Sequence, residues 1–70
     1  MATVAQIYIN GESQQLESNV TLAHLLNELG LAGKRLAVEL NQEIVPRSTY
    51  AEVVLEADDR IEIVQAIGGG

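Results

Sequence analysis

Apolar and polar residues alternate near the start of the chain. Residues 5–9 show the period-two pattern that predicts a half-buried β-strand. The Asn10-Gly11 pair that follows is a strong signal for a two-residue hairpin turn. Residues 13–17 are mostly polar and predict a return strand at the edge of a sheet. The inward-facing positions of the first strand are Ala5, Ile7 and Ile9.

A helical pattern follows this hairpin. Thr21 is a favourable N-cap, because its hydroxyl can accept a hydrogen bond from the unpaired amides of the first turn. Gly30 and Gly33 can adopt the positive φ at which helices often end. We expect a helix of roughly ten residues, which is about 15 Å long at ~1.5 Å per residue. Its apolar stripe consists of Leu22, Leu25, Leu26 and Leu29.

Two further strands are predicted in the second half of the chain. Residues 36–40 alternate between apolar and polar positions, and Asn41-Gln42 predicts a turn after them. Residues 43–45 predict the returning strand. Pro46 ends it, because proline lacks the amide donor that a strand needs.

The last part of the chain leads from short segments into a final strand. Residues 47–51 indicate irregular structure or a short helical turn, residues 53–55 a short extended piece and residues 57–60 a turn. Residues 61–67 predict the longest strand of the protein. Its inward residues are expected to be Ile61 and Ile63. The residues expected on the opposite face are Glu62, Val64 and Ala66.

This order of elements predicts an α+β protein with a β-grasp (ubiquitin-like) fold. Hairpin, helix, hairpin and final strand can form a mixed sheet of about five strands, with one main helix across one face. A right-handed crossover through the helix places the first and last strands side by side, parallel and central. We expect residues 1–67 to form this single domain and residues 68–70 to form a flexible glycine tail.

Composition and charge exclude several classes of function. The 70 residues include ten acidic and four basic side chains, and the net charge of −6 would repel a nucleic-acid backbone. No apolar run approaches the roughly 20 residues needed to span a bilayer, so no membrane partner is expected. The chain has no cysteine, which fits a reducing compartment, and the expected location is the cytoplasm. An acidic chain would also favour encounter with a basic protein surface.

Conventional catalytic groups are sparse in this sequence. His24 is the only histidine and lies off the leucine stripe, where a solvent-exposed helix position explains it better than a catalytic base. The Asp58-Asp59 pair falls in an expected turn, where acidic residues are ordinary, so no metal site is predicted. The chain is therefore not expected to be an enzyme or to bind a cofactor itself.

Gly68-Gly69-Gly70 admits two interpretations. Terminal glycines are common in frayed tails, which explains the composition taken alone. However, the triplet follows directly from the predicted final strand and would end on the chain's own carboxylate. Three extended residues reach roughly 10 Å, and glycine has no Cβ, so this tail can enter a narrow active site of a partner. There the carboxylate of Gly70 could be activated as an acyl adenylate and attacked by a nucleophile.

The sequence resembles the thiamin-pathway sulfur carriers (ThiS proteins) over most of its length. The stretches that carry the resemblance are residues 7–11, 21–22 with the leucines after them, 38–47, 59–64 and 67–70. The resemblance implies that an adenylating (E1-like) enzyme activates Gly70 with ATP, with Gly69 as its required neighbour. It also implies that a persulfide sulfur-donor protein converts the carboxylate to a thiocarboxylate. Thiazole synthase would then take this sulfur for the thiazole ring of thiamin.

One departure from the family pattern is Asp58, where the family often has glycine in the turn before the last strand. Aspartate tolerates the left-handed conformation better than most residues, so the predicted fold stands. Three alternatives remain open. They are a sulfur carrier of molybdopterin synthase, a protein modifier of the ubiquitin type, and a β-grasp interaction domain with an inert tail.

A partner-binding surface is expected on the sheet face that the helix leaves uncovered. Scattered exposed apolar residues are normal on protein surfaces, which is the competing explanation. The hypothesis is a recognition patch near the root of the tail, with Glu43 and Glu62 steering encounter with a basic partner. Its residues are Tyr8, Val64, Ala66 and Ile67.

Overall fold

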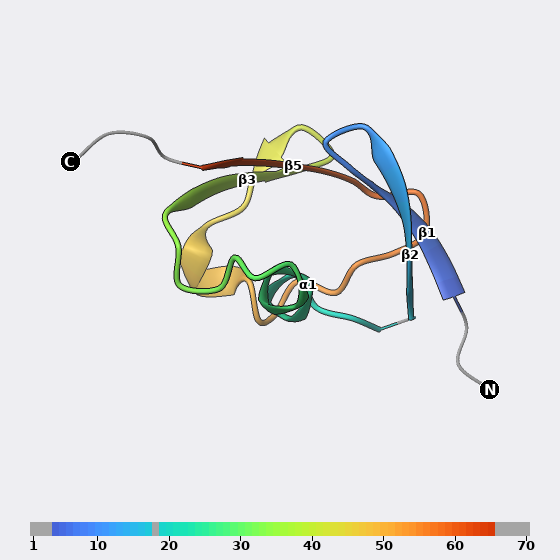
Figure 1. Cartoon of the computed structure of the whole chain (residues 1–70), viewed down its shortest axis with the longest axis horizontal. Helices are drawn as coiled ribbons and strands as arrows, with labels where there is room; N and C mark the ends of the chain where they lie inside the picture. Colours follow the sequence, from blue (N-terminus) through green and yellow to red (C-terminus); the bar gives the residue numbers. More distant parts are fainter. Residues whose placement is uncertain (1–3, 18, 66–70) are drawn as a thin grey trace.

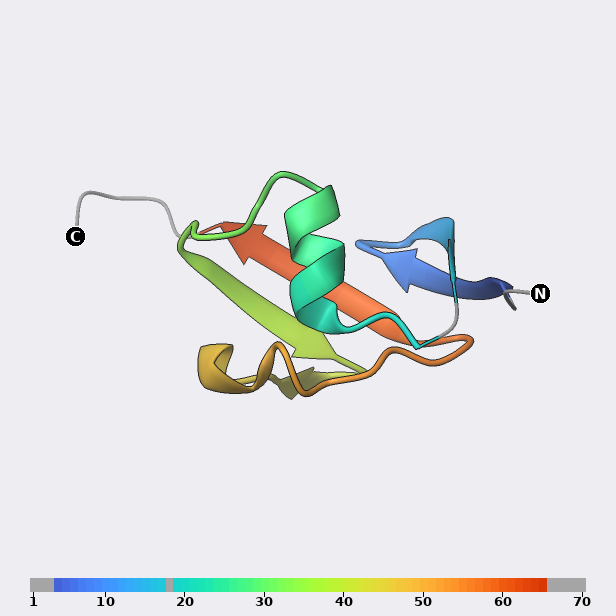
Figure 2. The same ribbon diagram turned by 90° about the horizontal axis from the view of Figure 1, so that it is seen from below.

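The structure, a computed structural model, describes residues 4–17 and 19–65. Its five strands form one sheet in the order β2-β1-β5-β3-β4, and α1 lies across one face of it (Figures 1 and 2). This mixed sheet with one helix confirms the predicted β-grasp fold. Within the described residues, no helix is long and apolar enough to cross a membrane. In chain order the elements are β1 (Val4–Ile9), β2 (Glu12–Glu17), α1 (Leu22–Glu28), β3 (Leu36–Leu40), β4 (Glu43–Ile44), the 3-10 helix η1 (Arg47–Thr49) and β5 (Arg60–Gln65).

The last strand occupies the centre of the sheet. β5 pairs with β1 in parallel, which confirms the predicted pairing of the first and last strands, and it pairs with β3 antiparallel. β2 pairs only with β1 and lies at an edge, as its polar sequence indicates. The strand that leads toward the C-terminus is therefore paired with a neighbour on both edges and lies in the middle of the sheet.

Left-handed residues form the tight turns. Asn10 and Gly11 have φ values of 50° and 87°, and Asn41 and Gln42 have φ values of 51° and 72°. Positive φ at both central residues is the conformation that matches the twist of a hairpin. Asp58 has a φ of 69°, which is the left-handed conformation expected at the position where the resembled family often has glycine. The predicted turns are therefore confirmed.

Helix α1 begins as the sequence predicts. The hydroxyl of Thr21 accepts a hydrogen bond from the backbone N–H of His24 at 3.1 Å, which satisfies one amide of the first turn. Leu22, Leu25 and Leu26 are buried against the sheet. In Figure 2 the helix lies in front of β5, between β1 and β3.

The end of α1 corrects the predicted length. The α-helix has seven residues rather than about ten. Gly30 turns to a φ of 75°, and the N–H of Leu31 then donates to the carbonyl of Leu26 at 2.8 Å, which closes the last turn. Leu29 is therefore the C-cap, and it is 37% exposed instead of buried with the other leucines.

The core is aliphatic and lies between α1 and the sheet. Ile61 of β5 is buried and Ile63 is partly buried against the same cluster, as predicted. β5 begins at Arg60, and the predicted continuation through Ala66 and Ile67 lies outside the described residues. The buried residues of the core are Ile7, Ile9, Leu22, Leu25, Leu26, Val38, Leu55 and Ile61.

The segment between β3 and β5 also follows the prediction, with one difference. β4 is two residues long, although the N–H of Val45 still donates to the carbonyl of Val38 at 2.9 Å before Pro46 ends the pairing. The short helical turn predicted after Pro46 is η1. Val54 forms an isolated antiparallel bridge with Thr21, which accounts for the predicted extended piece.

Candidate functional site

The predicted reacting group lies at the end of the chain. Gly68, Gly69 and Gly70 are outside the described residues, as are Ala66 and Ile67. What the structure describes is the strand that leads to them, up to Gln65. The site is therefore built from β5 and the surfaces beside it.

A side-chain clamp extends the pairing between β1 and β5. The backbone register joins Tyr8 to Arg60 and Ile9 to Ile61, after which β1 turns away. The side-chain amide of Asn10 then takes the place of a further β1 residue. Its Oδ1 accepts from the backbone N–H of Ile63 at 2.8 Å, and its Nδ2 donates to the Ile63 carbonyl at 3.3 Å. Asn10 thus holds β5 two residues beyond the end of the parallel ladder.

A second asparagine holds the start of the same strand. The Oδ1 of Asn41 accepts from the backbone N–H of Arg60 at 3.0 Å, and its Nδ2 donates to a carboxylate oxygen of Asp59 at 3.1 Å. The backbone N–H of Asn41 also donates to the Arg60 carbonyl at 2.7 Å. Asn10 and Asn41 both have positive φ and lie in hairpin turns. Each therefore has two roles: its backbone forms the turn, and its side chain binds β5. Sequence reasoning assigned them to turns and missed their side-chain role.

The sheet surface that faces away from α1 is here called the open face. Because side chains alternate along a strand, residues next to the buried Ile7, Val38 and Ile61 project to this face. Residues paired across neighbouring strands share a face, which adds Ile44 through its pairing with Glu39. The central residues of the open face are Tyr8 of β1, Arg60, Glu62 and Val64 of β5, Ala37 and Glu39 of β3, and Ile44 of β4.

Tyr8 and Val64 both lie on the open face, but the structure does not bring them together. Tyr8 is the register partner of Arg60. The guanidinium of Arg60 lies 5.1 Å from the centre of the Tyr8 ring in a cation–π contact. Val64 is four residues farther along β5, or about 13 Å at ~3.3 Å per residue. Glu62 lies between them on the same face. Tyr8 also accepts a hydrogen bond on its hydroxyl from Gln6 at 3.0 Å.

The other apolar residues of the open face lie on β3 and β4. Ala37 of β3 is the register partner of Val64, whereas Ile44 of β4 pairs with Glu39 at the level of Glu62. Val64 is 63% exposed and Ile44 is 66% exposed, which is high for branched apolar side chains. Sequence reasoning did not assign Ala37 or Ile44 to a site. The length of the Asn41-Gln42 turn could have placed Ile44 on this face, because a two-residue turn fixes which residues of β3 and β4 pair.

Two carboxylates face each other in the middle of the open face. Glu39 and Glu62 are register partners on β3 and β5. Like charges directly opposite each other destabilise a sheet. Within the described residues neither carboxylate has an ion-pair partner. A basic side chain of another protein would therefore find two carboxylates beside an apolar surface.

The other candidate groups are ordinary surface residues. His24 is exposed on α1, where its Nε2 lies 2.7 Å from a carboxylate oxygen of Glu28 one turn later. This confirms the expected solvent-exposed position. In residues 4–17 and 19–65, no three acidic or histidine side chains gather in a way that could hold a metal ion. Nothing in the described part of the chain assembles a nucleophile with a base.

Comparison with known proteins places this geometry in a family. The model of the ThiS family matches residues 4–70. The chain is 49% identical over 65 residues to the thiazole synthase of Magnetococcus marinus, a match that covers 93% of this chain but only 20% of that protein. It is 34% identical over 65 residues to the sulfur carrier protein ThiS of Escherichia coli K12, which covers 93% of this chain and 98% of that protein.

A solved structure shares the fold. The crystal structure of the thiamine biosynthesis protein ThiS from Geobacter metallireducens superposes with a TM-score of 0.80 at 25% sequence identity, covering 93% of this chain and 99% of that one. The family match extends over nearly the whole sequence and includes the three terminal glycines. On these grounds the chain belongs to the ThiS family.

Proposed function

We propose that this chain is a sulfur carrier of thiamin biosynthesis, a substrate of partner enzymes and not a catalyst. The observation that carries the proposal is the match to the ThiS family, which runs to Gly70. The fold supports it, because the strand that leads to the tail is held on both edges and by two asparagine side chains. A carrier needs little more than a well-paired strand before its tail and an unhindered terminal carboxylate.

The proposed cycle begins with the carboxylate of Gly70. An adenylating enzyme joins it to the AMP part of ATP and releases pyrophosphate. The terminal sulfur of a donor protein's persulfide then attacks the acyl carbon as AMP leaves, which gives an acyl disulfide. A thiol attacks the donor's sulfur in this S–S bond, forms a disulfide with it and releases the carrier as a thiocarboxylate. The chain itself binds no cofactor in this cycle, since ATP is held by the enzyme. We place the cycle in the cytoplasm, where ATP is available and reducing conditions suit persulfide chemistry.

Thiazole synthase is the proposed acceptor of the sulfur. A segment similar to this chain makes up 20% of the thiazole synthase of Magnetococcus marinus. Two parts of one polypeptide meet at a high effective concentration without a large interface. Where carrier and acceptor are separate chains, a docking surface has to bring them together.

The tail gives the first testable prediction. We expect deletion of Gly70 to abolish pyrophosphate release by the adenylating enzyme, because the reacting carboxylate is displaced. Gly69→Val should slow this step strongly, since its Cβ would collide in a narrow passage. Both variants should unfold at the temperature of the unchanged chain. Adenylation of Gly69→Val at the normal rate would contradict threading of the tail through a narrow passage.

The open face is the proposed docking surface, together with Ala66 and Ile67 at the root of the tail. Val64 supplies an exposed apolar anchor, and Glu62 with Glu39 supplies charge for a basic partner. Glu39 replaces the predicted Glu43, because Glu43 pairs with Leu40 on the helix side of the sheet. Removal of an apolar anchor from an interface commonly costs about 1–2 kcal/mol, a loss of roughly ten-fold in affinity. Charge steering should weaken as salt is added.

Matched variants test this surface. We expect Val64→Ala to weaken binding to the adenylating enzyme about ten-fold, and Tyr8→Ala to weaken it as well. Val54→Ala is the control, because Val54 is 49% exposed but pairs with Thr21 at the start of α1, away from the open face. Glu62→Gln should slow association while raising stability by roughly 0.2–1 kcal/mol through relief of the repulsion from Glu39. Equal affinities for Val64→Ala and Val54→Ala would remove the open face from the docking proposal.

A further inference from the structure

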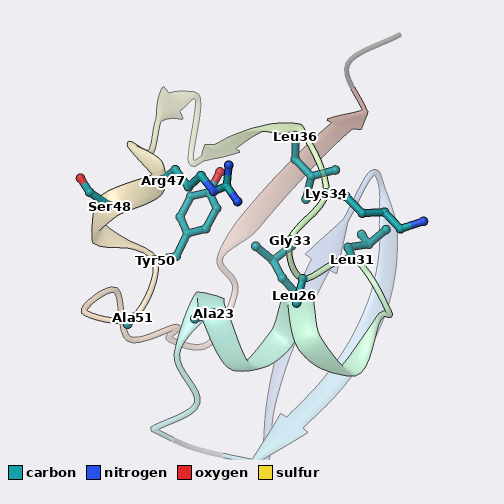
Figure 3. Close-up of a pocket in the computed structure, with 11 residues that line it drawn as sticks. Ala23, Leu26, Leu31, Gly33, Lys34, Leu36, Arg47, Ser48, Tyr50 and Ala51 are labelled. Atoms are coloured by element: carbon teal, nitrogen blue, oxygen red, sulfur yellow. The ribbon is translucent and has the colours of Figure 1, made fainter. Parts of the chain in front are cut away.

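A second surface lies on the helix side of the sheet. A pocket of about 260 Å³ opens between α1, the loop that follows it and the segment around η1 (Figure 3). Leu26 is buried at its floor, and Leu31, Leu36 and Tyr50 are partly buried hydrophobic residues around it. Residues from both halves of the chain thus form one apolar pocket. The open face, on the other side of the sheet, contributes nothing to it.

The charge at the rim of this pocket differs from that of the rest of the protein. The chain has ten acidic and four basic side chains, yet the pocket is lined by Lys34 and Arg47 and by no carboxylate. In Figure 3 the two cations lie on opposite sides of the apolar floor. Within residues 4–17 and 19–65, neither Lys34 nor Arg47 has an ion-pair partner. An anion at the rim would therefore not have to displace a carboxylate of the described residues.

These features define the chemistry of an occupant. The apolar floor favours a bulky hydrocarbon or aromatic group, because its burial removes apolar surface from water. The two cations favour carboxylates on either side of that group. The volume is slightly below the roughly 300–1,000 Å³ of typical small-molecule sites, which suits one side chain better than a whole cofactor.

We propose that this pocket binds an acidic peptide segment of a partner protein, with one bulky apolar side chain on the leucine floor and flanking carboxylates at Lys34 and Arg47. The site is separate from the open face, since the two lie on opposite sides of one sheet. A partner bound here leaves the open face uncovered. The carrier can then be held by one protein while another engages the open face.

Synthetic peptides test the proposal on the complete chain. The probe is a pentapeptide blocked at both ends, with one phenylalanine between two pairs of glutamates. One comparison peptide replaces the phenylalanine by alanine, and another replaces the glutamates by lysines. Amide chemical shifts of the carrier are followed by NMR. We expect the probe to shift Leu31, Lys34 and Tyr50, the alanine peptide to bind about ten-fold more weakly, and the lysine peptide not to bind at these residues.

Charge-reversal variants provide the matched control. Arg47→Glu and Arg60→Glu change the net charge equally, but only Arg47 borders the pocket. We expect Arg47→Glu to weaken probe binding at least about five-fold and Arg60→Glu to leave it within about two-fold. Lys34→Glu repeats the test at an independent exposed position if Arg47→Glu does not fold. Equal binding of the acidic and basic peptides, shifts confined to the open face, or equal losses in Arg47→Glu and Arg60→Glu would each overturn the proposal. Pocket shifts that depend on carrier concentration without peptide would identify a second copy as the occupant and also overturn it.

Discussion

The side-chain clamp of Asn10 offers a sharp test of how β5 is held. Replacement by glycine keeps the positive φ that the turn requires, because glycine adopts this conformation freely. The same change removes both hydrogen bonds to the backbone of Ile63. Asn10→Gly therefore isolates the clamp from the conformation of the turn.

The expected magnitude follows from the geometry of the two bonds. A typical intramolecular hydrogen bond contributes about 0.5–1.5 kcal/mol, and the bond at 3.3 Å should lie at the lower end. Asn10→Gly should therefore lower the free energy of unfolding by about 1–2 kcal/mol. Asn10→Ala should cost about 1–2 kcal/mol more, because alanine in the left-handed conformation brings its Cβ close to the next carbonyl. In a domain of this size each kcal/mol lowers the melting temperature by roughly 4–8 °C.

Two measurements check this result. Urea unfolding gives the loss of stability, and amide hydrogen exchange reports on the N–H of Ile63, which Asn10 protects. Asn19→Gly is the matched control, because Asn19 has a φ of 65° but its side chain makes no hydrogen bond within the described residues. That variant should stay within about 0.5 kcal/mol of the unchanged chain. If Asn10→Gly is as stable as Asn19→Gly and the Ile63 amide keeps its protection, the clamp does not hold β5.

Two further substitutions test the core and the turn before β5. Leu25→Ala should lower the free energy of unfolding by about 2–5 kcal/mol in urea titration, because Leu25 is buried and its truncation leaves a cavity under the sheet. A loss below about 1 kcal/mol would mean that α1 is not packed as described. Asp58→Gly should raise stability by about 1 kcal/mol, since glycine accepts the φ of 69° without the clash of a Cβ. A lower melting temperature for this variant would contradict strain at Asp58.

Features that depend on near neighbours in the sequence could be predicted well. The Asn10-Gly11 turn, the Thr21 cap and the glycine at the end of α1 are local signals, and each is present in the structure. The predicted apolar stripe of the helix includes one leucine too many, Leu29. Periodicity alone assigns Leu29 to the buried face, but the chain has already left the helix at that residue because Gly30 closes the last turn.

Features that join distant parts of the chain could not be predicted in the same way. The bond from Ile63 to Asn10 spans 53 positions, and no periodic pattern marks it. The facing carboxylates Glu39 and Glu62 depend on the register of β3 against β5, which the intervening segment does not reveal. The pocket between α1 and η1 likewise requires two segments to meet in space. Sequence patterns predict the reacting carboxylate at Gly70, and the pairing of β5 with β1 and β3 forms the open face on the strand that leads toward it.

The mass of the chain after reaction tests the central claim most directly. The 70-residue chain is incubated with a ThiS-adenylating enzyme, ATP, a persulfide sulfur donor and a thiol reductant, and the intact protein and its C-terminal peptide are weighed by mass spectrometry. The ThiS protein of Escherichia coli, treated in parallel, shows that the enzymes are active. If this chain is a sulfur carrier, its mass increases by the exchange of one oxygen for one sulfur, the change lies on Gly70, and it requires ATP. An unchanged mass while the Escherichia coli protein is converted would contradict the proposed function.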